Sequence, residues 1–245
     1  MRWKRLLKVT VWLLSLGFVA LLAGVECVYR AALAQVRAFP QKVTTPALPE
    51  SWNRVAWAHR EKTATPQVQP AWPTTIVFTM AKLVLRRHQP QSASHDLSPQ
   101  GFRLATHVAR QWSRLLANEH KRLPRLGELA LTIWLTRNWS AEELLAFEAH
   151  HIWFGRDLFG VSAAAPALLH KDVARLDLAD AAFLLVVSAK AWDVECAPDR
   201  LRRRRDTLLE ELRAVGVVTQ MELESARSAP WPLAATASAA SCPDY

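Results

Sequence analysis

Glycine is scarce in this chain, with 7 glycines in 245 residues, whereas alanine and leucine are abundant. Tight turns use glycine because it adopts positive φ angles at no steric cost, so a turn-rich β fold would need more of it. Alanine and leucine are strong helix formers. The composition therefore predicts a mainly α fold.

Cysteine is also rare, and its spacing does not suit a metal site. The 3 cysteines, Cys27, Cys196 and Cys242, are far apart and odd in number. Structural zinc sites draw their cysteine and histidine ligands from short, regular spacings, so we expect no metal site. In an oxidising compartment Cys196 and Cys242 could form one disulfide, and the sequence leaves open whether they do.

Acidic residues are missing from the N-terminal segment, where a basic stub precedes an uncharged apolar run at residues 9–25. This order is typical of a signal peptide or of an uncleaved signal-anchor. A cleavage site would be Ala32-Leu33-Ala34, but it lies well beyond the run, with Glu26 and Arg30 between. We therefore favour the anchor, and the positive-inside rule then places the N-terminus in the cytoplasm and the rest of the chain outside.

The net charge is +9 and the isoelectric point is about 10.0. A basic chain suits an acidic partner such as nucleic acid, an anionic lipid surface or a phosphorylated substrate, and the charge also serves solubility. The exported topology and the lack of a groove-reading motif argue against nucleic acid.

The rest of the chain divides at prolines and polar stretches. Three prolines between residues 40 and 49 end the first helix, and from residue 101 onward apolar residues recur at spacings of three and four. Capping boxes that begin at Ser140 and Asp177 mark two helix starts. We expect an N-terminal stub and transmembrane anchor at 1–29, a linker at 30–50, one helical domain at 51–228 and a disordered tail at 229–245.

Residues 76–85, with the sequence IVFTMAKLVL, are strongly apolar. Such a segment is either a core helix of the domain, which we favour, or an amphipathic segment that dips into the membrane.

An ordered series of motifs runs through the second half of the chain. It comprises Phe154-Gly155, Phe159-Gly160-Val161, Ala163-Ala164-Ala165, Lys171 and Leu176 to Ala182. These fall without gaps in the pattern Y-F-G-x-x-x-Y-G-V-E-A-A-A, G-K and L-T-L-A-E-A-A. Arg200 to Ala226 follows as a basic helix, a glycine turn and a T-x-x-E helix start. By these motifs the chain resembles glycosyltransferase family 51, the domain of class A penicillin-binding proteins and of monofunctional peptidoglycan glycosyltransferases, as a divergent member.

The resemblance implies a lysozyme-like, mainly α glycosyltransferase domain behind a single N-terminal transmembrane helix, in the bacterial inner membrane with the domain in the periplasm. It implies lipid II as acceptor and a growing, undecaprenyl-diphosphate-linked glycan as donor. One glutamate acts as general base on the acceptor hydroxyl. A second glutamate, basic groups and, in an active enzyme, a divalent cation help the diphosphate to leave. The sequence indicates no other cofactor.

The family motif R-K-x-x-E aligns with residues 124–128, so the resemblance places Glu128 at the second catalytic glutamate and Arg125 at a diphosphate contact. Arg110 likewise falls on a basic diphosphate-binding position. Of the hydroxyl-rich motif Gly-Gly-Ser-Thr-x-Thr-Gln-Gln, aligned with residues 100–107, Gly101 remains. Outside the resemblance, each of these charges would be interpreted as a solvated helix residue.

The first family motif, Glu-Asp-x-x-Phe-x-x-His, holds the general base and should lie between residues 50 and 80. The best candidate is residues 54–62, which offer His59, Arg60 and Glu61 in place of Glu-Asp. Glu61 is either a displaced base or a surface glutamate, and His59 is a weaker candidate for the base.

The residues leave two functions open. In one, the protein is a peptidoglycan glycosyltransferase that extends glycan from lipid II with degenerate catalytic motifs. In the other, it is a catalytically inactive relative, a pseudoenzyme that binds the lipid-linked precursor or another cell-wall synthesis protein as a regulator or scaffold.

Overall fold

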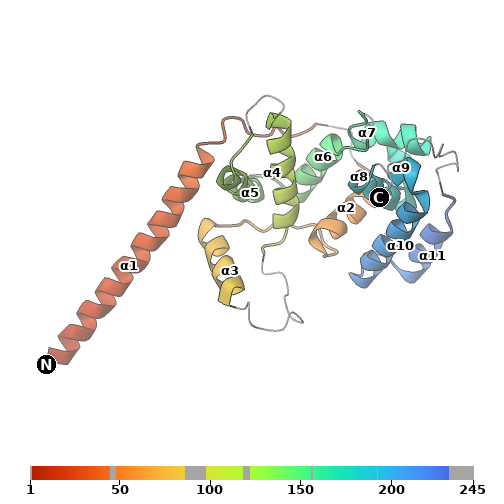
Figure 1. Ribbon diagram of the computed structural model, residues 1–245. Helices are drawn as coiled ribbons and strands as arrows, with labels where there is room; N and C mark the ends of the chain where they lie inside the picture. Colours follow the sequence, from red (N-terminus) through yellow and green to blue (C-terminus); the bar gives the residue numbers. More distant parts are fainter. Residues whose placement is uncertain are drawn as a thin grey trace.

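The computed structural model describes residues 2–44, 48–85, 98–117, 122–155, 157–191 and 193–231. Over these residues the chain is helical, and its β structure is one isolated antiparallel bridge between Trp153 and Phe159 (Figure 1). The prediction of a mainly α fold is confirmed. Cys196 is disulfide-bonded and Cys27 is free, whereas Cys242 and the expected tail beyond Trp231 lie outside the described residues.

The helices follow one another closely along the chain. They are α1 (Arg2–Leu33), α2 (Glu50–Glu61), α3 (Pro73–Leu85), α4 (Phe102–Ala117), α5 (Arg125–Asn138), α6 (Ala141–His151), α7 (Val161–Ala164), α8 (Leu178–Ala189), α9 (Asp193–Cys196), α10 (Pro198–Ala214) and α11 (Gln220–Ser228). A π-helical turn, Ala165–Leu169, continues α7, because Pro166 has no N–H for the regular α-helical ladder.

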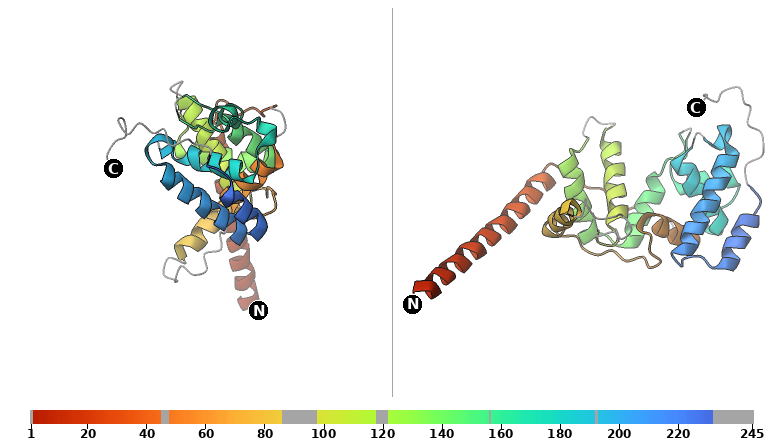
Figure 2. Two further views of the ribbon diagram at one scale, coloured as in Figure 1. Left: turned by 90° about the vertical axis from the view of Figure 1, so that its right-hand side faces the viewer. Right: turned by 60° about the horizontal axis from the view of Figure 1, so that its bottom comes forward.

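Helix α1 projects from the domain as a single long rod, while α10 and α11 lie at the opposite end of the molecule (Figures 1 and 2). The segment Val11–Leu33 of α1 is long and apolar enough to cross a membrane. Large apolar side chains on this segment, among them Trp12, Leu14 and Leu16, are exposed. The last turns of α1 contact α3 and α5 of the domain.

Those last turns of α1 form a small apolar core with α3 and α5. Tyr29 and Ala32 pack there with Ile76 of α3 and with Ala130 and Ile133 of α5. Ile76, near the start of α3, therefore belongs to this core, whereas the side chains of residues 80–85 lie outside the described part of the chain, so the choice between a core helix and a membrane-dipping segment stays open. Val77 and Phe78, which follow Ile76 on α3, are exposed.

The main core lies between α2, α4, α6, α8 and α10, and it includes the fully buried Trp52 and Trp57 of α2. Both expected capping boxes are present: Ser140 caps α6 and Asp177 caps α8. Each box satisfies helix N–H groups that would otherwise have no partner. They fix where two core helices begin, and so which residues of each helix face inward.

Helix α5 offers a matched test of this core. Leu131 is fully buried, whereas Leu126 on the same helix is 57% exposed. We expect Leu131→Ala to lower the stability by about 2–5 kcal/mol, because it leaves a cavity, and Leu126→Ala to change it by less than about 0.5 kcal/mol. Thermal unfolding of the detergent-solubilised protein, followed by circular dichroism, measures both. Equal losses in the two variants would contradict the described packing of α5.

Candidate functional site

Three helices meet at an ion pair between a fully buried carboxylate and a half-buried guanidinium group. Arg60, in the last turn of α2, donates from Nε to Oε1 of Glu148 on α6 at 2.8 Å, and its Nη2 lies 2.6 Å from the same oxygen. His107 of α4 brings its Nε2 within 3.2 Å of Arg60 Nη2 and 3.4 Å of Glu148 Oε1. Residues 60, 107 and 148 thus form one charged cluster between α2, α4 and α6.

Glu148 is buried because α6 turns one face into the main core. Leu144, one turn earlier, lies on that face, and both side chains have 0% exposure. A buried carboxylate is costly unless a partner meets its charge, and Arg60 is that partner. Oε2 of Glu148 is buried and has no hydrogen-bond partner among the described residues.

The two histidines of this region are held neutral. Burial lowers the pKa of His59 to about 4, and the nearby charges of Arg60 and Lys62 act in the same direction. Burial also lowers the pKa of His107, where neighbouring arginines oppose protonation and Glu148 favours it. At neutral pH neither imidazole adds to the positive charge of the cluster.

Glu61 is committed to the backbone of α4. Its Oε2 accepts from the N–H of Gly101 at 3.0 Å, and its Oε1 accepts from the N–H of Leu104 at 2.6 Å. The carboxylate therefore caps the first turn of α4, a position where negative charge is favourable. Gly101 adopts a positive φ of 85°, and a Cβ there would lie 2.9 Å from Val68. The glycine kept from the hydroxyl-rich motif thus shapes this turn.

The other expected site residues lie on α4 and α5. Glu128 is half-exposed in the first turn of α5, where Arg125 is exposed, and Arg110 is exposed on α4. The helices α4 and α5 pack together, and the N–H of Leu123 donates to Ser113 Oγ at 3.3 Å. This contact joins the start of α5 to the second half of α4.

Glu61 and Glu128 are thereby placed toward opposite ends of α4. Leu104, which Glu61 holds, and Ser113, beside the start of α5, are separated by about 14 Å along the helix axis. Arg110 lies between them, and its charge reaches His107. Along α4, Arg110 is three residues from His107 and three residues from Ser113, so it lies between the Arg60–His107–Glu148 cluster and the start of α5.

Sequence reasoning missed Glu148 and the pairing of Arg60 with it. One signal was present: in the segment LLAFEAHH, Glu148 follows Leu144 by four residues and shares its apolar face. A lone acid on such a face requires a buried partner. Among the described residues no group of three or more His, Cys, Asp or Glu side chains is arranged to hold a metal ion.

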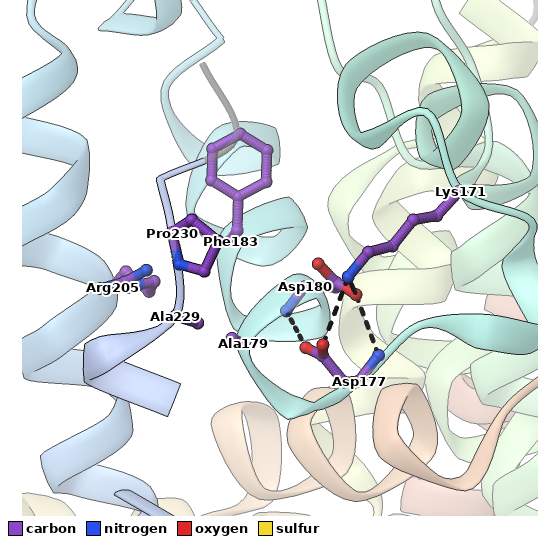
Figure 3. Close-up of a pocket in the computed structure, with 8 residues that line it drawn as sticks. All are labelled: Lys171, Asp177, Ala179, Asp180, Phe183, Arg205, Ala229 and Pro230. Carbon is purple, nitrogen blue, oxygen red and sulfur yellow. Dashed lines mark hydrogen bonds and ion pairs between the residues drawn. The ribbon is translucent and has the colours of Figure 1, made fainter. Parts of the chain in front are cut away.

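A small pocket of about 70 Å³ lies between α8 and α10 (Figure 3). On one wall, Lys171 binds Asp180 at 2.6 Å and Asp177 at 3.3 Å, and the bond to Asp180 raises the pKa of Lys171. Arg205, on another wall, is buried and binds Asp206 at 2.9 Å. Both cations have carboxylate partners, so this pocket is a structural joint between the two helices.

Residues 100–213 match the family model described as Transglycosylase. The chain is 27% identical over 120 residues to penicillin-binding protein 1A of Rickettsia prowazekii, an alignment that covers 47% of this chain and 15% of that protein. It is 29% identical over 126 residues to penicillin-binding protein 4 of Bacillus subtilis, covering 50% and 20%, and 24% identical over 151 residues to penicillin-binding protein 1A of Pseudomonas aeruginosa, covering 61% and 18%. The chain thus spans a fifth or less of the length of these curated relatives.

The helical fold and the family match together define a transglycosylase domain with a lysozyme-like fold. Over residues 100–213 the chain matches this family model as a divergent sequence, in agreement with the resemblance of its motifs to glycosyltransferase family 51. Most of the Arg60–His107–Glu148 cluster lies inside the matched range, and Arg60 lies upstream of it.

The buried pair has a testable energetic signature. We expect Arg60→Leu to destabilise the protein by about 3 kcal/mol, because it leaves the Glu148 charge buried without its partner. Arg60→Leu combined with Glu148→Leu should cost at least about 1 kcal/mol less than the sum of the single variants. Glu211→Gln, which removes the exposed pair with Lys62, serves as control and should cost less than about 1 kcal/mol. Additive effects of the two substitutions would show that the pair is not coupled.

The lowered pKa of His59 predicts a loss of stability in acid. Unfolding restores an ordinary pKa of 6.5, so the unfolded chain binds a proton first, and stability falls as the pH drops below 6.5 toward the folded value. With a folded pKa of about 4, His59 should account for a loss of about 2 kcal/mol between pH 7.5 and pH 5. Unfolding of wild type and His59→Gln across this pH range measures the difference in slope. Parallel slopes would show that His59 is not buried in its neutral form.

Proposed function

We propose that this protein is a membrane-anchored, peptidoglycan glycosyltransferase-like protein that binds lipid II or an undecaprenyl-diphosphate-linked glycan during cell-wall synthesis, without polymerising glycan efficiently. The observation that carries this proposal is the engagement of Glu61. Both of its oxygens accept backbone N–H groups of α4, so the displaced-base candidate is occupied as a helix cap. A general base typically contributes 10²–10⁴-fold to the rate, and a chain without one would turn over slowly.

The neighbouring position supports the same conclusion. Arg60 lies beside Glu61 in the candidate first motif, and its guanidinium pairs with Glu148. An arginine stays protonated in proteins and cannot accept the proton of a sugar hydroxyl. Basic groups are nevertheless retained: Arg110 on α4 and Arg125 on α5 are exposed and suited to phosphate oxygens. This combination favours binding of an anionic lipid headgroup over proton transfer.

The location proposed for the protein rests on α1. A basic stub precedes its apolar segment, so we place the N-terminus in the cytoplasm and residues 51–228 as a glycosyltransferase-like domain in the periplasm, at the inner membrane. Residues 30–50 serve as the linker. Suitable partners are the membrane, lipid II or its glycan product, and other cell-wall synthesis proteins; nucleic acid is not among them.

A slow polymerase is the second candidate function. Glu128 supports it, because this carboxylate stands at the family's second glutamate and is half-exposed in the first turn of α5. In that case Arg110, Arg125 and a divalent cation would stabilise the leaving diphosphate, and Glu61 would need to leave its cap to act as base.

Labelled lipid II separates the two functions. We expect the full-length protein in lipid nanodiscs to bind lipid II without forming polymer, and Arg110→Ala and Arg125→Ala each to weaken binding about tenfold through loss of one charge-assisted contact. Arg202→Ala, exposed on α10 at the far end of the domain, serves as the matched control. Glu61→Gln and Glu128→Gln should leave the absence of polymer unchanged.

Two results would contradict this proposal. Polymer made by wild type and lost in Glu128→Gln or Glu61→Gln would establish the polymerase instead. Binding that is equally strong in Arg110→Ala, Arg125→Ala and Arg202→Ala would show that the expected diphosphate contacts are not used.

A further inference from the structure

His107 lies between a positive and a negative side chain, and its Nε2 can form a hydrogen bond with only one of them at a time. This atom is 3.2 Å from Nη2 of Arg60 and 3.4 Å from Oε1 of Glu148. In the neutral ring that carries its proton on Nδ1, Nε2 accepts a hydrogen bond from the guanidinium of Arg60. With a proton, it can only donate, and its acceptor is then the carboxylate of Glu148. The protonation state of His107 therefore selects its partner.

The charges around His107 come from each side of α4. Arg60 faces it from α2, Glu148 faces it from α6, and Arg110 and Arg114 lie on α4 itself. Helix α5, which also packs against α4, adds apolar side chains to the core. A proton on His107 is thus attracted by one carboxylate and repelled by three guanidinium groups.

Glu148 has an acceptor to spare for the protonated imidazole. Its Oε2 is buried without a hydrogen-bond partner among the described residues, while both close contacts of Arg60 are to Oε1. An unsatisfied buried carboxylate oxygen costs free energy, which a new donor would recover. The cluster is therefore poised between two pairings of the same carboxylate.

We propose that His107 is a pH-dependent latch between α2 and α6. When His107 gains a proton, its imidazolium pairs with Glu148, while Arg60 loses Nε2 as an acceptor and is repelled by the new positive charge, so the last turn of α2 is held less firmly against α6. Glu61, next to Arg60, holds the amides of Gly101 and Leu104, so the loosening is passed to the first turn of α4. The consequence for ligand rests on the proposed function: acid adds a positive charge beside Arg110 and strengthens the binding of a diphosphate headgroup.

Hydrogen–deuterium exchange of the full-length protein in nanodiscs tests the latch. His107→Gln keeps hydrogen-bonding groups at this position but cannot titrate, and comparison at equal pH cancels the intrinsic pH dependence of exchange. At pH 7.5 we expect wild type and His107→Gln to exchange alike at residues 58–64 and 101–107. At pH 5 and below, wild type should exchange at least about fivefold faster there, because local opening becomes more frequent. His170→Asn, at an exposed histidine with a left-handed backbone that asparagine tolerates, should behave as wild type.

A constant ratio of the exchange rates of wild type and His107→Gln from pH 7.5 to pH 4.5 would overturn the latch. If His107→Gln does not fold, NMR of the wild type decides the question. The Nε–Hε signal of Arg60 should then move with the titration of the His107 ring, and an Arg60 signal that ignores this titration would refute the proposal.

Lipid II binding in the same pH series separates the latch from the proposed function. We expect the affinity of wild type to rise about tenfold on acidification beyond any rise seen in His107→Gln. Failure to bind lipid II at every pH would overturn the proposed function, and the exchange measurement would still decide the latch.

Discussion

A carboxylate that is fully buried has to find its counter-charge inside the protein, and that of Glu148 finds it in Arg60. This requirement couples the last turn of α2 to the middle of α6 and draws His107 of α4 into the same contact. The apolar core alone would allow these helices to shift slightly against one another. The ion pair restricts the relative position of the helices, because it is strong only when the guanidinium and the carboxylate are close and aligned. The placement of Glu61 on the first amides of α4 follows, since it is the next residue along α2.

Parts of the fold that depend on neighbours in the sequence could be predicted. The helix starts at Ser140 and Asp177 follow from capping boxes that close within three residues. The mainly α fold follows from composition and from apolar spacing. The Arg60–His107–Glu148 cluster could not be predicted in this way, because its members are 47 and 88 residues from Arg60 along the chain and no periodic pattern links them. Glu61 illustrates the same limit: its type suggested a base, and only its contacts show that it caps a helix.

The side chains at the end of α2 are not free to take up a proton from a ligand. The guanidinium of Arg60 stays protonated and is bound to Glu148, and the neighbouring carboxylate of Glu61 accepts backbone N–H groups of Gly101 and Leu104. The pair also keeps the local charge balanced, since Arg60 and Glu148 are opposite in charge and adjacent, and the fold does not contain an unpaired buried charge there.

The small apolar core formed by the last turns of α1 fixes the position of the domain relative to the apolar segment of α1. Tyr29 and Ala32 pack against Ala130 and Ile133 of α5, and Glu128 lies about one turn before those contacts. With α1 in a membrane, the first turn of α5 stays close to the lipid surface and cannot swing outward on a loose tether. If the proposed function holds, a lipid-borne ligand would reach the first turn of α5 by lateral diffusion in the same leaflet, with its headgroup at the level of that turn.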